Sequence, residues 1–504
     1  MKIGHCRSVV HSILLSLWLG SCAQTALAHN THPLGTPATT HQQIGLFSGT
    51  DFVLTTGHCN ACRLPTQASW YFREETIAIP ADPTAQEGVE QNLTPPFLVW
   101  LGSPEILDHA TLTSDHERLK FTDGSTVPLR LVSQLTTNQS YYNDTSASFF
   151  SSRPLRLRGQ TLGELTNPIF EARTIWPADY LLTSDRAIRA TTERRTIAQL
   201  IEAGGTLPND TITTHVLWER GGTPWAGKPV LGAILNGAQG DDDEAHGGHF
   251  GIFTGHVGPH GEWADWLMNN FYDLDMVSEK GILPAMVPMD SYLMDLNSGQ
   301  SYYRPSALLV LVLKHDRMAV RYQSSIQAIF RQFYRHELDY DHSRSNCAGL
   351  SIDQLRAFGW QIPFQGSSSW IKAMAGYFYM AATDQSLASG LKTYQYFLEE
   401  RTRLLPRVTF EAIGNDALDL LQPSGAPRAL TSYEQWLVED VEAVLYVHIP
   451  QIPSSRAMGT FAVASLDEYQ HRVPSDRTKW KTIPTAPRPF PSDLQIAPVQ
   501  AELL

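Results

Sequence analysis

Positive charge is in short supply in this chain, which has 38 Lys and Arg against 51 Asp and Glu and a formal net charge of -13. That balance argues against nucleic acid or an anionic membrane surface as the partner. Beyond the N-terminal segment there is no apolar stretch of about 18 residues, so no further transmembrane span is predicted. No internal repeat is visible. Aromatic side chains, by contrast, are plentiful, including 12 Trp, and this composition predicts a folded protein with a sizeable core.

The N-terminal segment has the layout of an export signal. Lys2 and Arg7 supply positive charge, and residues 9–20 form a short apolar core. Two cleavage interpretations remain open. The favoured one is an A-x-A site that ends at Ala28, and the other is a run resembling a bacterial lipobox, which would put a lipid anchor on Cys22. Both predict an exported protein of the periplasm or cell envelope, as a lipoprotein in the second case.

Cysteine is scarce, with 5 residues in 504. Cys6 and Cys22 belong to the signal segment, while Cys59 and Cys62 form a CxxC whose members are close enough to pair. For this CxxC a local disulfide is favoured over a redox pair or half of a zinc site. Cys347 is left without a structural role, and an unpaired cysteine in an exported protein points to a reactive thiol.

Changes of pattern along the chain divide it into five parts, and the fold class expected is a multidomain α+β protein. The parts are a signal peptide (1–28), a β-rich N-terminal domain (29–210), an α+β domain (211–365), a helical C-terminal region (366–480) and a Pro-rich tail (481–504).

Within these parts the hydrophobic periodicity predicts individual elements. Strands are expected at 214–220, 247–254, 263–272 and 307–314, and helices at 318–334, 348–358, 370–382, 391–404 and 433–446. The region from Trp370 to Leu404 is apolar at helical spacing, which favours a packed helical region over a helix lying on a membrane.

The candidate site combines Cys347 with His249. Cys347 follows the cap-type residues Ser345 and Asn346, directly before a helical pattern. The start of a helix favours a thiolate, because free N–H groups and the helix dipole stabilise negative charge there. His249 lies in a Gly-rich strand, where its imidazole could form an ion pair with the thiolate and protonate the leaving group.

A third polar group should orient the imidazole of His249. If the chain after this strand folds as a hairpin about Gly258, residues near 265 to 269 lie across from His249, and facing parity selects Asp265, then Asn269. His260 would take this place only if the hairpin were tighter.

These residues resemble a known family. The strand His249-Phe250-Gly251-Ile252-Phe253, the aromatic run Met268-Asn269-Asn270-Phe271-Tyr272 and the Asn346-Cys347 helix start are similar to the circularly permuted branch of the papain-like NlpC-type superfamily. The Lnb N-terminal periplasmic domain is the nearer likeness, and lecithin retinol acyltransferase-like proteins are a more distant one. The resemblance covers residues 212–362.

By position, the resemblance assigns Cys347 as the nucleophile and His249 as the base. It implies a cysteine hydrolase or acyltransferase that acts on amide or ester bonds. Hydrolysis of amide or peptide bonds is the favoured activity, and no cofactor or bound metal is expected. Two alternatives stay open: an acyltransferase acting on lipid or lipoprotein substrates, and a non-catalytic envelope scaffold or binding protein that keeps the fold.

An acidic run, Asp241 to Glu244, and His246 come shortly before His249. Such a group could hold calcium or zinc, although Gly247 and Gly248 argue against the helix that a three-residue histidine spacing would suit. A solvated acidic loop is the favoured interpretation, with a role in lining the substrate cleft as the functional alternative.

Overall fold

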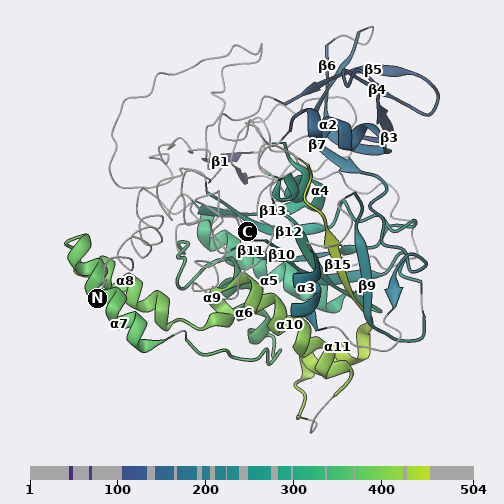
Figure 1. Cartoon of the computed structure of the whole chain (residues 1–504). Helices are drawn as coiled ribbons and strands as arrows, with labels where there is room; N and C mark the ends of the chain where they lie inside the picture. Colours follow the sequence, from purple (N-terminus) through teal and green to yellow (C-terminus); the bar gives the residue numbers. More distant parts are fainter. Residues whose placement is uncertain are drawn as a thin grey trace, which may run out of the picture.

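The computed structural model describes residues 105–453 together with two short strands, β1 (Gly45–Ser48) and β2 (Gln67–Trp70), which pair with each other (Figure 1). Residues 133–141, 164–166, 190–195, 205–209, 223, 238–247, 274–281, 297–298, 303, 335–337, 368 and 424–427 are left out of that range. The signal segment, Cys59 and Cys62, the acidic run and the Pro-rich tail therefore lie outside the described residues.

The first unit is a small closed barrel with the strand order β3-β4-β5-β7-β6. Its elements are β3 (Glu105–Leu112), β4 (Arg118–Lys120), β5 (Thr126–Leu131), α2 (Asp144–Ser151), β6 (Leu155–Leu162) and β7 (Ile169–Pro177). Inside it, Leu155, Leu157 and Phe170 are buried as the alternation of β-strands requires. Gly159 allows β6 and β7 to approach, because a Cβ there would lie 2.1 Å from the carbonyl oxygen of Glu171.

The second unit is an eight-stranded sheet with the order β13-β12-β11-β10-β14-β15-β9-β8. Its strands are β8 (Ile188–Arg189), β9 (Thr213–Glu219), β10 (Pro229–Asn236), β11 (His249–His256), β12 (Leu267–Asp273), β13 (Ile282–Pro288), β14 (Ser306–Leu313) and β15 (Val441–Ile449). Every neighbouring pair is antiparallel except β8 with β9. The central strands β10 and β14 are buried along their whole length, which explains their continuous apolar sequences.

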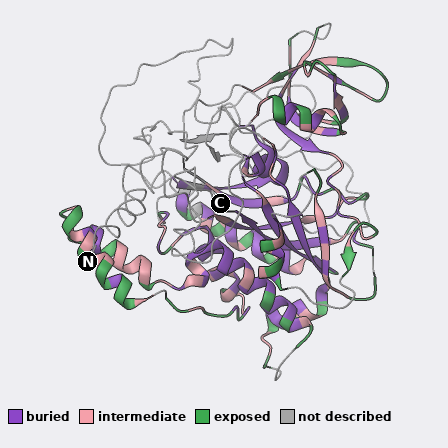
Figure 2. Ribbon diagram, viewed as in Figure 1, coloured by how far each residue is buried: buried purple, intermediate pink, exposed green. Residues whose placement is uncertain are grey.

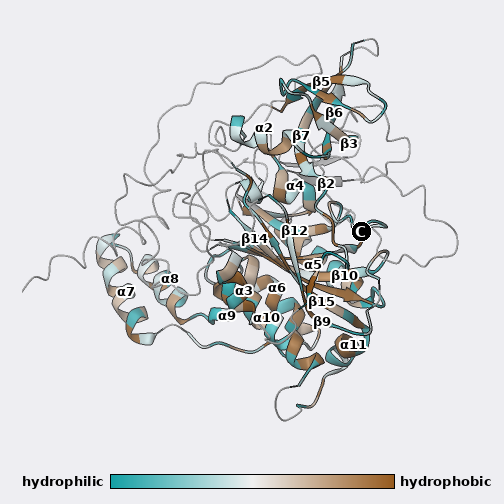
Figure 3. Ribbon diagram, turned by 45° about the vertical axis from the view of Figure 1, so that its right-hand side comes forward, coloured by the Kyte–Doolittle hydropathy of each residue, from teal (hydrophilic) through white to brown (hydrophobic). Residues whose placement is uncertain are grey.

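The two faces of this sheet are covered differently. One, here called the helix face, carries Leu235, Phe250 and Leu309 and packs against α3 (Ile197–Ala203), α5 (Arg317–Tyr334), α6 (Cys347–Ala357), α10 (Pro406–Leu421) and α11 (Ser432–Asp440). The other, here called the barrel face, carries Ile234 and Phe253 and shares a core with the barrel and with α4 (Met289–Met294). In Figures 2 and 3 the sheet between these layers is buried and hydrophobic.

Two further helices, α7 (Trp370–Thr383) and α8 (Leu387–Leu398), form a hairpin that projects from the side of the molecule (Figure 1). The short helix α9 (Arg401–Leu404) joins the hairpin to α10, and the 3-10 helix η7 (Gln300–Tyr302) precedes β14. Within the described residues, no helix is both long enough and apolar enough to cross a bilayer.

The architecture confirms the expected α+β class but changes the expected division of the chain. The region 366–480 was expected to be a separate helical part, with a helix at 433–446. Instead α11 ends at Asp440 and Val441–Ile449 forms β15 between β14 and β9 of the central sheet. The C-terminal part of the described chain is therefore built into the same core as Cys347.

Ion pairs hold the barrel against the barrel face of the sheet. Arg158 Nε of β6 lies 2.8 Å from Asp290 Oδ2 of α4, and Arg173 Nε of β7 lies 2.6 Å from Asp295 Oδ2. These side chains are 4% and 1% exposed in each pair. Charges withdrawn from water in this way are stable only while each keeps its partner.

We expect Asp290→Ala to lower the free energy of unfolding by about 3–5 kcal/mol, because it leaves the Arg158 guanidinium buried without its nearest counter-charge. Denaturant unfolding measures this loss. As a matched control, Glu171→Ala removes the partner of Arg130, whose side chain is 50% exposed, and should cost no more than about 1 kcal/mol. Equal losses in the two variants would contradict the role given to the buried pair.

Candidate active site

Cys347 is the first residue of α6, one residue before the helix start that the sequence predicted at Ala348. The helix is capped by Asn346, whose Oδ1 accepts a hydrogen bond from the Gly349 N–H at 2.7 Å. Asn346 Nδ2 donates to the carbonyl oxygen of His342 at 3.0 Å and so fixes the loop that leads into the helix. Cys347 is a free cysteine, 7% exposed, on the helix face of the sheet. A thiol is therefore placed at the positive end of a helix dipole.

The sulfur of Cys347 is surrounded by hydrogen-bond donors. Burial raises the pKa of this thiol above its ordinary value, while hydrogen bonds from the Phe250 N–H, the Tyr340 hydroxyl and the N–H groups of Ala348 and Cys347 act in the opposite direction. Because burial outweighs the donors, the resting thiol is protonated at neutral pH. The donors would nevertheless stabilise a thiolate once the proton is removed.

The Phe250 N–H is available to the sulfur because β11 and β12 separate at this point. The two strands pair only at Phe253 with Met268 and at Thr254 with Leu267. At Ile252 the N–H donates instead to the Oδ1 of Asn269, at 2.8 Å. In an extended strand the N–H groups of residues 250 and 252 point to the same edge. The β11–β12 ladder therefore has an opening at Phe250, whose N–H donates to Cys347 Sγ on the helix face instead of to the neighbouring strand.

His249, the first residue of β11, lies next to this opening, but its side chain is on the barrel face. Its register partner is Asn236, and its ring centroid lies 6.0 Å from that of Tyr292 in α4. A side-chain hydrogen bond joins the imidazole to Asn270. Nε2 is buried and has no hydrogen-bond partner among the described residues. The thiol of Cys347 and the imidazole are therefore not hydrogen bonded to each other in this state.

The imidazole is neutral in this environment. Burial lowers the pKa of His249 to about 3, the positive charge of Arg304 acts in the same direction, and the hydrogen bond with Asn270 opposes them. A raised thiol pKa and a lowered imidazole pKa together disfavour the thiolate–imidazolium ion pair that the sequence suggested. The resting site instead holds a neutral thiol and a neutral base.

Asn270 forms the hydrogen bond to His249 that the sequence argument assigned to Asp265 or Asn269. The hairpin about Gly258 was expected to put residue 267 across from His249, whereas pairing of Phe253 with Met268 makes residue 272 the register position opposite it. This shift of five positions is odd, and an odd shift exchanges the two faces of a strand.

The three residues proposed from the sequence have other partners. Asp265 accepts hydrogen bonds from Arg156 at 2.7 Å and from Arg158 at 3.2 Å, at the contact with the barrel. Asn269 Oδ1 accepts from Ile252 N–H, and the Asn269 Nδ2 is buried without a partner among the described residues. The backbone N–H of His260 donates to Glu262 in the connecting turn.

Tyr340 is a site residue that the sequence argument missed. The Cys347 N–H donates to its hydroxyl oxygen at 3.4 Å, and the hydroxyl in turn bonds to the sulfur. Its ring centroid lies 5.1 Å from that of His342 and 5.3 Å from that of Phe271. The tyrosine-rich run before Asn346 was visible in the sequence, but only the fold shows which tyrosine reaches the thiol.

A second group of polar side chains supports the first turn of α6. Ser351 Oγ donates to the Cys347 carbonyl oxygen at 2.9 Å, and the Tyr322 hydroxyl donates to Ser351 Oγ and Asn269 Oδ1, both at 3.4 Å. Tyr322 and Ser351 are fully buried. This network ties α5, α6 and β12 together behind the thiol and fixes the position of the helix terminus.

The described residues contain no group of three or more His, Cys, Asp and Glu side chains placed to hold one metal ion. His246 and the run Asp241 to Glu244, which carried the metal alternative, lie outside the described residues, as do Cys59 and Cys62.

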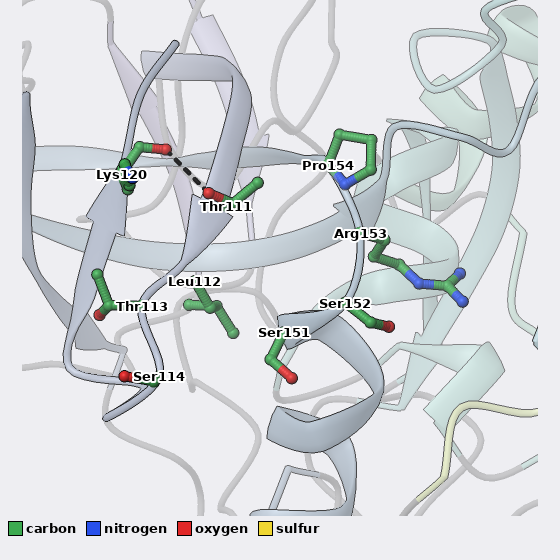
Figure 4. Close-up of a pocket in the computed structure, with 9 residues that line it drawn as sticks. All are labelled: Thr111, Leu112, Thr113, Ser114, Lys120, Ser151, Ser152, Arg153 and Pro154. Atoms are coloured by element: carbon green, nitrogen blue, oxygen red, sulfur yellow. Dashed lines mark hydrogen bonds between the residues drawn. The ribbon is translucent and has the colours of Figure 1, made fainter. Parts of the chain in front are cut away.

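A surface cavity of about 580 Å³ belongs to the barrel rather than to the Cys347 site (Figure 4). It is lined mainly by hydroxyl and aliphatic groups of Thr111, Leu112, Thr113, Ser114, Lys120, Ser151, Ser152, Arg153 and Pro154. The guanidinium of Arg153 points away from the other lining residues (Figure 4) and lies over the ring of Phe149, 4.0 Å from its centroid. The cavity contains none of the site residues.

The protonated, buried thiol leads to a prediction about alkylation. We expect iodoacetamide to label Cys347 at neutral pH at least about tenfold more slowly than a free thiol, because the thiolate is the reacting species and little of it is present. The rate should rise with pH through the alkaline range. Mass spectrometry of the peptide that contains Cys347 separates this label from the other cysteines.

Urea-unfolded protein provides the control for this measurement and should react like a free thiol. Labelling of the folded protein near pH 6 that is faster than labelling of a free thiol would show that a thiolate is already present, contrary to this prediction.

The fold and the geometry of the site stand without counterparts in the comparisons. No protein-family model, no curated protein and no solved structure matches this chain.

Proposed function

We propose that this chain is an exported thiol hydrolase of the cell envelope that cleaves amide or peptide bonds through an acyl-enzyme. The observation that carries the proposal is the environment of two atoms. Cys347 Sγ lies at a helix N-terminus among four hydrogen-bond donors. His249 is the residue before Phe250 on β11. Its imidazole is hydrogen bonded to Asn270, and its Nε2 is buried without a partner among the described residues.

In the proposed reaction the neutral His249 acts as a general base. It removes the Cys347 proton as the sulfur attacks the substrate carbonyl carbon and a C–S bond forms. The C–N bond then breaks, and the amine leaves with the proton from His249. Water, deprotonated by the same imidazole, attacks the thioester, which releases the acid and restores the thiol.

The developing oxyanion needs donors that are already in place. The Cys347 N–H and the Tyr340 hydroxyl meet beside the sulfur, since the N–H donates to the hydroxyl oxygen at 3.4 Å. A substrate carbonyl oxygen entering between them could accept from both. Tyr340 is therefore assigned to oxyanion stabilisation.

Catalysis also requires the imidazole to reach the opening from the barrel face. His249 is at the end of the β10–β11 ladder, where its pair with Asn236 is the last, and it follows Gly248, which has a φ of +78°. Turning this one residue over would break only the terminal pair of the ladder. The proposal therefore treats the described conformation as a resting state, which substrate binding converts to the active state.

A second candidate function is a non-catalytic binding protein of the cell envelope. It is favoured by the raised pKa of the buried thiol and by the imidazole that projects from the opposite face of the sheet. Acyl transfer, in contrast, would use the same acyl-enzyme with an acceptor other than water, so the first half of the reaction would not distinguish it from hydrolysis.

Trapping the acyl-enzyme separates catalysis from binding. The full chain is incubated with soluble peptidoglycan peptides, quenched in acid and digested, and the peptide that contains Cys347 is analysed by mass spectrometry. The hydrolase proposal predicts an acyl adduct on Cys347 in the wild type, none in Cys347→Ala, and release of the amine. Retention of intact peptide by both proteins, with no adduct and no cleavage, would establish the binding function instead.

A further inference from the structure

The α7–α8 hairpin carries its large apolar side chains on the outside. Along α7 the exposed residues Ile371, Met374 and Phe378 follow helical spacing and are 63%, 38% and 62% exposed. Along α8 the residues Leu387, Leu391 and Leu398 do the same and are 73%, 49% and 36% exposed. Trp370 begins α7 with an exposure of 68%. Each helix therefore has an apolar stripe that no described residue covers, as the colouring of Figure 2 reflects.

The contact between the two helices includes small residues at its closest points. The buried residues are Ala373 and Met380 in α7 and Ser389 and Gly390 in α8, and the rings of Tyr377 and Tyr394 also meet between the helices. A Cβ at Gly390 would lie 2.7 Å from the carbonyl oxygen of Tyr377, and one at Gly376 would lie 3.0 Å from the Thr393 side chain. The helices approach closely because side chains are missing at these points.

This arrangement differs from that of a hairpin that folds in water, where large apolar residues fill the helix–helix contact and polar residues face out. Close approach of helices at small residues, together with large apolar side chains on the outside, is typical of helices that pack within lipid. The sequence favoured a packed helical region for residues 370–404, but the structure leaves the apolar stripes unpacked.

The charge and the length of the two helices indicate how the hairpin would lie on a bilayer. The hairpin carries two lysines, Lys372 and Lys392, against one aspartate, Asp384, in a chain whose net charge is -13. The charge of the hairpin itself therefore does not oppose contact with a zwitterionic or weakly anionic membrane surface. Neither helix can cross a bilayer, so the pair would lie in the interface plane with Trp370 and Phe378 inserted.

The base of the hairpin is attached to the helix that carries the thiol. Glu400, 5% exposed, accepts hydrogen bonds from Arg356 of α6 at 2.6 and 2.7 Å. Arg403 bridges Asp353 of α6, at 2.8 Å, and Glu399, at 2.7 Å. A surface that holds the hairpin would therefore also hold α6 at a fixed position relative to that surface.

From these observations we infer that the α7–α8 hairpin is a membrane-docking element that lies in the surface of a lipid bilayer. The inference does not rest on the proposed catalytic function. Insertion of apolar side chains drives the binding, so it should survive raised salt and occur on zwitterionic as well as weakly anionic lipid.

The test compares two matched double variants of the full chain on vesicles of phosphatidylethanolamine and phosphatidylcholine. Phe378→Glu with Leu391→Glu alters the hairpin, and Ile106→Glu with Ile188→Glu alters exposed apolar residues of β3 and β8. Co-sedimentation of the hairpin variant should fall by at least about tenfold, and that of the control should not change. All three proteins keep residues 1–28, so any vesicle binding through the N-terminal segment is the same in each.

Hydrogen exchange gives a local readout that the N-terminal segment cannot mimic. Amide exchange within 370–398 should slow when wild-type protein is mixed with vesicles. Equal vesicle binding by the two double variants, or protection confined to other segments, would overturn the inference. So would concentration-dependent self-association that the hairpin variant abolishes while vesicles have no effect, because the stripes would then bind a second copy of the chain.

Discussion

Replacing Cys347 with alanine is expected to lower kcat/KM for an amide substrate by at least about 10⁴-fold, because removal of the nucleophile leaves only the binding and oxyanion contributions to catalysis. Cys347→Ser should also lose most of the activity, since a hydroxyl beside the same imidazole is a far weaker nucleophile than a thiol. Initial rates with the peptide substrate identified by acyl trapping measure both losses.

Both substitutions are small enough to leave the fold intact. Cys347 is buried at 7% exposure, and its neighbour Asn346 continues to cap α6 through Gly349 whichever residue follows it. Circular dichroism and unfolding curves should therefore match those of the wild type within about 1.5 kcal/mol. Undiminished turnover by the folded Cys347→Ala protein would contradict the thiol mechanism.

The helix start at Cys347 and the central strands could be predicted because local signals determine them. Asn346 is a cap residue in sequence and in structure, and helix α6 begins one residue later. The continuous apolar run expected at 307–314 is the strand Ser306–Leu313, buried on both faces. At these positions propensity and tertiary packing favour the same structure.

The orienting residue of His249 could not be predicted because it depends on strand register. Trp263 was expected to begin the second strand. Instead its ring lies 4.6 Å from that of Trp176 in β7, and its Nε1 donates to the carbonyl oxygen of Tyr180, shortly after β7, at 2.8 Å. This anchoring lengthens the connection, so that β12 begins at Leu267. Only a contact with a distant part of the chain could reveal this.

The last described strand shows a second limit of sequence patterns. The run Val441–Ile449 is short and apolar, and a buried strand and a buried helix are hard to tell apart at that length. The capping box at Thr431 and Glu434 starts a helix, and periodicity alone extends this helix too far. Pairing with β14 and β9 makes this run a strand, and both of these strands lie far from it in the sequence.

The opening between β11 and β12 connects these structural details to the proposed chemistry. A regular ladder would satisfy the Phe250 N–H within the sheet and leave no place for a sulfur atom. Because Asn269 Oδ1 accepts from the Ile252 N–H, the β11–β12 ladder is interrupted, and the Phe250 N–H donates to the thiol. The sequence argument considered Asn269 as the residue that orients His249. In the structure Asn269 instead accepts a hydrogen bond from the β11 backbone, two residues from the N–H that donates to Cys347.

We expect His249→Gln to lower kcat/KM by about 10²–10⁴-fold while leaving KM nearly unchanged, since the imidazole transfers protons in the transition state rather than binding substrate. Glutamine can keep the hydrogen bond with Asn270, so the loss would report proton transfer rather than a collapsed site. Asn270→Ala should change the rate less, because Asn270 bonds to the imidazole in the resting state and the base itself is retained.

The pH dependence distinguishes this role from a purely structural one. A general base works only when unprotonated, so activity is retained above its pKa and lost as the pH falls through it. Because burial holds the pKa of His249 at about 3 in the resting state, kcat/KM should show no inflection near pH 6.5, where an ordinary histidine titrates. An acid limb centred near 6.5 that disappears in His249→Gln would mean that the imidazole is exposed before substrate binds. The burial of Nε2 would then not describe the reacting enzyme, and the resting-state proposal would be wrong.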